Sequence, residues 1–131
     1  MEKQQITIEH HLHSRSRPII WQAISTAGGL SKWMADEVIE HDNKFEFIWG
    51  TPWTSQEKRS AIIDKVKNEL VTIHWEDETD NDSHVELRIL RNDLTDDFML
   101  QITDFVQDED EDSIIQIWEQ NLDRLHRTTG L

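Results

Sequence analysis

The sequence has no cysteine among its 131 residues, which limits the classes of protein to which it can belong. Without thiols there are no disulfides, no thiolate nucleophile and no zinc site with sulfur ligands. A disulfide-stabilised secreted module is therefore disfavoured. Long hydrophobic runs are missing too, and the first residues lack the apolar segment of a signal peptide. We therefore expect a cytoplasmic protein that does not insert into membranes.

Positive charge is scarce, with 13 Lys and Arg against 27 Asp and Glu, and the formal net charge is -14 at pH 7. This charge repels phosphate backbones and anionic membrane surfaces, so no nucleic-acid partner is expected. A basic protein partner is compatible with the charge, although acidity also simply keeps small proteins soluble and apart. The length fits one domain spanning 1–131, as a monomer or weak homodimer.

Glycine and proline are rare, with four and two residues, and they separate segments of different periodicity. Residues 3–14 alternate apolar and polar side chains, which predicts a strand with one buried face. Ser16 and Pro18 suit the N-cap and first turn of a short helix. Gly28 and Gly29 then separate this helix from a second short one, so the two are expected to form a helical corner.

From 36 to 106 the pattern has period two, which predicts a series of antiparallel strands. Turns are expected at 41–43, 50–52, 68–69, 80–82 and 92–93. The expected pairing places Val71, Ile73 and Trp75 opposite Ile89, Leu87 and Val85, which in turn lie opposite Phe98, Leu100 and Ile102. Phe45, Phe47 and Trp49 are expected to extend this apolar face.

The segment 60–66 permits two registers. One register points Ile62, Asp64 and Val66 inward, and the other points Ala61, Ile63 and Lys65 inward. Either one buries a charged residue unless a bulge intervenes. An inward Asp64 would have a raised pKa and would orient a polar ligand group, whereas an outward Asp64 would be inert.

An amphipathic helix is predicted from 113 to 127, after the acidic run 108–112. Carboxylates at this position interact favourably with the positive end of the helix, and the run lacks the ligand pattern of a calcium loop. The predicted fold is α+β, with a strongly curved antiparallel sheet wrapped around this helix and two short helices after the first strand.

Catalytic and metal-binding patterns are weak. His11 and His13 share one face of the first expected strand beside His10, but no further ligand nearby in the sequence completes a zinc site. An exposed polar strand face is the preferred interpretation, and neither a metal nor another cofactor is expected. No nucleophile with a base, no carboxylate pair and no phosphate loop is evident, so we expect a protein that is not an enzyme.

Several motifs together resemble a known superfamily. They are RPIIWQAIST at 17–26, GLSKW at 29–33, IHWE at 73–76, VELRI at 85–89, LQITDF at 100–105, and Trp118-Glu119 leading to Leu122 and Leu125. The chain resembles the START-like (SRPBCC) helix-grip superfamily over nearly its whole length. It is most similar to the branch with homologues of the chaperone ATPase activator domain, and to small bacterial START-like proteins of uncharacterised function.

The resemblance implies a hydrophobic cavity between the curved sheet and the last helix, where relatives bind lipids, sterols, polyketides or other apolar molecules. Binding of a small hydrophobic molecule, lipid-like or aromatic, is the leading functional expectation, with access gated by the corner at Gly28 and Gly29. The candidate ligand-binding residues are Phe45, Phe47, Trp49, Asp64, Ile73, Trp75, Leu87, Phe98, Leu100 and Trp118. The alternative is that the aromatic side chains fill the core, and that the protein is an interaction or co-chaperone-like module.

Overall fold

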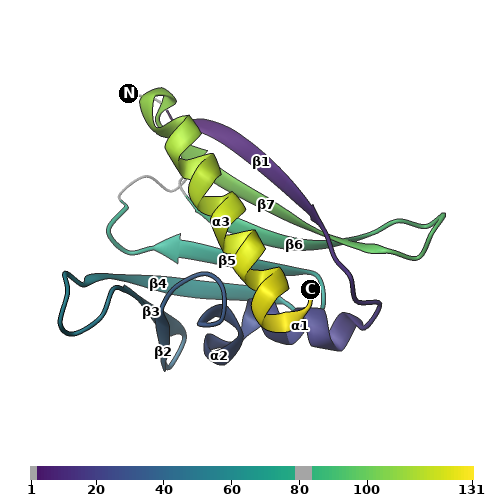
Figure 1. Cartoon of the computed structure of the whole chain (residues 1–131), viewed down its shortest axis with the longest axis horizontal. Coiled ribbons are helices and arrows are strands. Elements are labelled where there is room, and N and C mark those ends of the chain that lie inside the picture. The colour runs from purple at the N-terminus through teal and green to yellow at the C-terminus, as the bar shows by residue number, and fades with distance from the viewer. Residues whose placement is uncertain (1–2, 79–83) are drawn as a thin grey trace.

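Seven strands and a long C-terminal helix make up most of the protein (Figure 1). The computed structural model describes residues 3–78 and 84–131. The strands are β1 (Gln4–His11), β2 (Glu37–His41), β3 (Lys44–Trp49), β4 (Glu57–Val66), β5 (Leu70–Trp75), β6 (Val85–Arg91) and β7 (Phe98–Val106). The helices are α1 (Arg17–Ser25), α2 (Ala27–Leu30), the short 3-10 helix η1 (Asp108–Asp110) and α3 (Glu111–Thr129).

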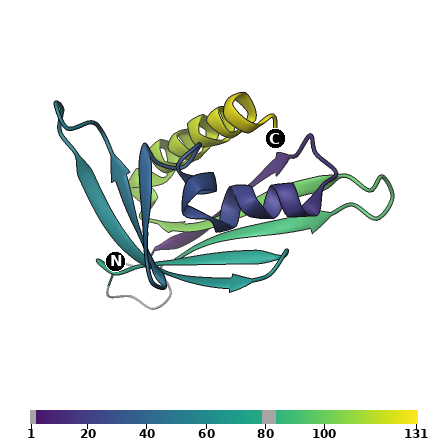
Figure 2. The same cartoon turned by 90° about the horizontal axis from the view of Figure 1, so that it is seen from below.

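The strands form one antiparallel sheet in the order β1-β7-β6-β5-β4-β3-β2. This sheet is curved, and α3 crosses its inner face, with α1 and α2 on the same side of the sheet as α3 (Figure 2). The predicted α+β helix-grip architecture is therefore confirmed. The order of the strands in the sheet largely follows their order in the sequence. Five of the six strand pairs join strands that are consecutive in sequence, and only β1 pairs with the distant β7.

Element boundaries differ slightly from those expected. The first strand ends at His11, and the chain then turns toward the Ser16 N-cap, whose hydroxyl accepts a hydrogen bond from the Ile19 amide at 3.4 Å. The last helix begins at Glu111, because part of the acidic run is helical, and ends at Gly130 with φ of 80°. A left-handed glycine with its amide bonded back to His126 is a common helix stop.

The corner between α1 and α2 requires a glycine at one position. A Cβ atom on Gly29 would lie 2.1 Å from the carbonyl oxygen of Gln22 and 2.8 Å from Cα of Ala23. A Cβ atom on Gly28 would meet nothing within 4 Å. The two helices therefore approach so closely that only the second glycine of the pair is sterically required.

Strand pairing keeps the expected inner face but is shifted by two residues. Val71 lies opposite Leu87, rather than opposite Ile89 as expected, and Leu87 lies opposite Ile102. The turn between β6 and β7 is longer than expected, because the Asn92 amide bonds to the Asp97 carbonyl oxygen at 2.8 Å. A shift of two leaves every side chain on its own face, so the apolar surface survives. The turn expected at 80–82 falls outside the described residues.

The register of β4 is resolved. Ala61 and Ile63 are buried, and Asp64 faces outward with its side chain 71% exposed, 3.0 Å from Nε2 of His74. The expectation that Asp64 lines the interior is therefore wrong. Lys65 shares the inward side with Ala61 and Ile63, but it is exposed because the strand has by then run past the core, so no charge is buried.

The core fills the centre of the sheet and the second half of α3. Its largest fully buried side chains include Phe45, Phe47, Ile73, Leu87, Leu100 and Leu125. Trp33, in the connection after α2, is also completely buried, and its indole N–H donates to the Ala23 carbonyl oxygen at 2.9 Å. This end of the molecule is closed and densely packed.

Candidate functional site

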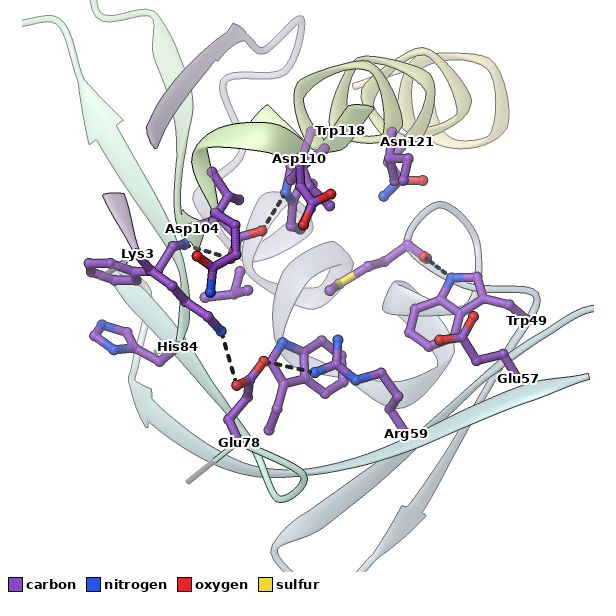
Figure 3. A pocket seen from close by; sticks show the side chains of 18 of the residues that line it. Lys3, Trp49, Glu57, Arg59, Glu78, His84, Asp104, Asp110, Trp118 and Asn121 are labelled. Carbon is purple, nitrogen blue, oxygen red and sulfur yellow. Dashed lines mark hydrogen bonds and ion pairs between the residues drawn. The ribbon is translucent and has the colours of Figure 1, made fainter. Parts of the chain in front are cut away.

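A partly open pocket of about 630 Å³ lies between the sheet and the first half of α3 (Figure 3). It is next to the packed core, at the other end of the helix. Its apolar wall consists of Met34, Trp49, Trp75, Val85, Phe105, Val106, Ile114, Ile117 and Trp118. Its polar lining consists of Lys3, Glu57, Arg59, Glu78, His84, Asp104, Gln107, Asp110, Gln120 and Asn121.

Three tryptophans from three elements face this pocket. Trp49 ends β3, Trp75 ends β5, and their ring centroids are 6.2 Å apart. Trp118 projects from α3 and is almost fully buried. Two of the rings are held by hydrogen bonds: Nε1 of Trp49 donates to the Met34 carbonyl oxygen at 3.0 Å, and Nε1 of Trp118 donates to Asp104. Two of the three rings of the aromatic wall are therefore anchored to the backbone or to a neighbouring side chain.

Arg59 is the centre of a charged network along one side of the pocket. Its guanidinium group donates to both carboxylate oxygens of Asp77 at 2.8 Å and lies 3.6 Å from Glu78. Glu78 in turn pairs with Nζ of Lys3 at 3.0 Å. The same guanidinium group lies 4.1 Å from the ring centroid of Trp75. Arg59 therefore combines a bidentate ion pair with a cation–π contact.

Asp104 is a half-buried carboxylate at the base of the helix. It accepts hydrogen bonds from Nε1 of Trp118 at 2.9 Å and from the Phe105 amide at 2.8 Å. Burial raises the pKa of Asp104 above its ordinary value, and these two hydrogen bonds, with the charges of Arg59 and Lys3, act in the opposite direction. The net result is a carboxylate that would be stabilised by another positive charge nearby.

The rim of the pocket holds further polar groups. Glu57 lies directly opposite Trp49 in the β3–β4 pairing, so the two side chains are neighbours on the inner side. Asp110 lies at the start of α3. His84 lies 3.3 Å from Glu86 through Nε2, while its Nδ1 is buried without a hydrogen-bond partner among the described residues.

The structure divides the candidate ligand-binding residues into three groups. Trp49, Trp75 and Trp118 line the pocket. Phe45, Phe47, Ile73, Leu87, Phe98 and Leu100 are buried in the core and do not line it. Asp64 is on the outer face. The expectation of a gate at Gly28 and Gly29 is wrong for this pocket, since neither α1 nor α2 contributes to its lining.

The charged residues of the lining were not predicted from the sequence, although strand alternation indicates that some of them face inward. Asp104 continues the alternation of Leu100 and Ile102, and Glu57 and Arg59 continue that of Ala61. In the structure, Lys3 and Glu78 lie outside the strands and reach the pocket only through the folded arrangement.

His11, His13 and His126 lie together near the C-terminal end of α3, away from the pocket. The ring centroids of His13 and His126 are 4.7 Å apart, and those of His11 and His13 are 5.6 Å apart. Within residues 3–78 and 84–131, no three His, Asp or Glu side chains are arranged to hold a metal ion. None of the helices in the same ranges combines the length and hydrophobicity that a bilayer span requires.

Comparison with known proteins supports the architecture. The family model of the START-like superfamily domain matches residues 1–131. The solution structure of BfR322 from Bacteroides fragilis is 34% identical, with 98% of this chain and 92% of that chain covered and a TM-score of 0.64. A search of curated proteins gives no match.

More distant solved structures share the fold alone. A Staphylococcus aureus protein of unknown function, SA2116, is 15% identical with a TM-score of 0.69, covering 98% of this chain and 96% of that chain. The Aha1 dimer from Colwellia psychrerythraea is 12% identical with a TM-score of 0.71, covering 96% of each chain. With a matching family model over the whole sequence and a relative of the same architecture at 34% identity, this chain belongs to the START-like superfamily.

Proposed function

We propose that this protein binds a small apolar molecule, lipid-like or aromatic, in the pocket between the sheet and α3, without catalysing a reaction. The observation that carries the proposal is the convergence of Trp49, Trp75 and Trp118 on one partly open pocket. A volume of about 630 Å³ is within the usual range for small-molecule sites. Rigid aromatic walls offer apolar contact at little cost in side-chain entropy.

The polar groups of the pocket support binding rather than chemistry. Arg59 is engaged by Asp77, Lys3 by Glu78, and the Asp104 carboxylate by Trp118 and Phe105. Groups fixed in this way can orient a ligand, and no pair among them has the arrangement of a nucleophile and its base.

Native mass spectrometry of the protein purified from its own host, followed by extraction of any adduct, tests the proposal. A stoichiometric apolar adduct is expected. Asn121→Trp, which adds bulk to the pocket lining, should abolish the adduct, while Gln116→Trp on an exposed part of the same helix should retain it. An adduct that survives Asn121→Trp would place the ligand elsewhere.

A clean apo mass under gentle conditions would instead favour the second class, a protein-interaction or co-chaperone-like module. The dense core of the sheet supports this alternative, because six of the residues expected to line a cavity are buried in the core instead. Affinity capture of a single stoichiometric protein partner from host lysate, together with an apo mass, would support it.

A further inference from the structure

Acidic side chains outnumber basic ones around the pocket. Four carboxylates line it, those of Glu57, Glu78, Asp104 and Asp110, against two cations, Lys3 and Arg59. With all of these groups ionised, the lining carries two more negative than positive charges. The net charge of the whole chain, -14, is also negative and adds to the negative potential at the pocket. The potential inside the pocket therefore favours a positive ligand group.

The two basic side chains already have partners. Arg59 makes two hydrogen bonds of 2.8 Å to Asp77, and Lys3 pairs with Glu78 at 3.0 Å. An incoming anion would have to displace these carboxylates. By contrast, Glu57, Asp104 and Asp110 have no ion-pair partner among the residues that the structure describes. The unneutralised charge at the pocket is thus negative.

The aromatic wall already accepts one cation. The guanidinium group of Arg59 lies 4.1 Å from the ring centroid of Trp75. Trp49 lies 6.2 Å from Trp75, and its direct cross-strand neighbour is Glu57. An indole ring beside a carboxylate without a partner is the combination that attracts ammonium groups, since the ring face and the carboxylate act in the same direction.

We infer that the ligand is an organic cation, with an amine or quaternary ammonium group beside Trp49 and Glu57 and an apolar body along Trp75 and Trp118. This inference rests on the proposed function and specifies the chemical class of its ligand.

A matched series of one ring system with three charges tests the inference. Naphthylmethylamine, naphthylmethanol and naphthoate share an aromatic body and are positive, neutral and negative at neutral pH. Their affinities are measured by two-dimensional NMR of the indole N–H signals, assigned with Trp→Phe variants. The signals of Trp49 and Trp75 should shift and that of the exposed Trp53 should not, with the amine binding about threefold to thirtyfold more tightly than the alcohol.

Two variants separate the pocket from the overall charge. Glu57→Gln should weaken the amine about threefold or more and leave the alcohol unchanged, because only the charge opposite Trp49 is lost. Glu119→Gln removes the same charge from an exposed position of α3 outside this pocket, and it should change the amine affinity by less than about twofold. Both positions are exposed, so both variants should fold.

Three results would overturn the inference. If the alcohol or the naphthoate binds as tightly as the amine, the pocket does not select a cation, although the proposed function stands. If Glu57→Gln and Glu119→Gln weaken the amine equally, the preference comes from net charge rather than from the pocket. If none of the three compounds shifts Trp49 or Trp75, both the cation preference and an apolar site at this pocket are contradicted.

Discussion

Nε1 of Trp118 donates a hydrogen bond of 2.9 Å to Oδ2 of Asp104, and this contact joins the long helix to the last strand of the sheet. Trp118 is only 4% exposed, so the donor side of this bond is buried. The helix is also attached near its end, where the Thr128 hydroxyl donates to the Lys32 carbonyl oxygen at 3.2 Å. The middle and the C-terminal end of α3 are therefore fixed to the rest of the fold.

Trp118→Ala should lower the free energy of unfolding by about 3–5 kcal/mol, because it removes a large buried ring and leaves a cavity. Trp118→Phe keeps most of the ring but leaves Asp104 without one donor, and should cost about 1–2 kcal/mol. Chemical denaturation measures both. Ile117→Ala, at a half-exposed neighbouring position, is the control and should stay within about 1 kcal/mol of the parent protein. An unchanged midpoint for Trp118→Ala would contradict the placement of the helix.

Gly29→Ala should destabilise the protein by about 1–3 kcal/mol or more, because the added Cβ atom would meet the Gln22 carbonyl oxygen at 2.1 Å. Gly28→Ala is a matched control, with nothing within 4 Å of the added atom. It should be neutral or stabilise the helix by up to about 1 kcal/mol. Thermal unfolding of the two variants checks the contrast, and equal melting temperatures would show that the helices are farther apart than described.

The register of β4 can be tested with neighbouring residues. Asp64→Leu should change the free energy of unfolding by less than about 0.5 kcal/mol, because the side chain is 71% exposed and its contact with His74 is at the surface. Ile63→Asp should abolish cooperative folding, because it places an unpaired carboxylate in the core. Circular dichroism in urea distinguishes the two outcomes. The opposite order of effects would restore the register with Asp64 inside.

His10 should make stability depend on pH. Burial, followed by the charges of His13, His126 and His11, lowers the pKa of His10 below 6.5, and a contact with the Leu131 carbonyl oxygen opposes this shift only in part. As pH falls below 6.5, the unfolded chain takes up the proton before the folded protein does, so stability is lost on acidification. His10→Gln should flatten this loss between about pH 7 and 5, measured by urea denaturation. A slope identical to that of the parent would show that His10 is not responsible.

Much of the fold could be predicted because its signals are local. The alternation of strands, the Ser16 cap and the stripe of α3 each lie within one segment of sequence. The expected register between β6 and β7 was off by two residues, because it depends on how the chain closes the turn at Asn92–Asp97. A periodic pattern specifies a face, whereas turn geometry specifies which partner each residue meets.

The site was predictable only in part. Periodicity correctly placed Phe47 and Trp49 on one face of the sheet. However, Phe47 is packed in the core, whereas Trp49 lines the pocket. That difference depends on how far α3 lies from each part of the sheet, which no local pattern records. The charged network beside Trp75 requires Lys3 and Glu78, 75 residues apart, to meet in the folded protein.

The two halves of α3 face different surroundings, with Leu122 and Leu125 sealed in the core and Ile114 and Ile117 beside the pocket. One helix thus combines a first half that lines the pocket with a second half that packs in the core. Substitutions before Trp118 should change the lining of the pocket while the second half continues to hold the fold. If the proposed function holds, a combinatorial library confined to that first half would change ligand selectivity without disturbing folding, as a scaffold for small-molecule sensors requires.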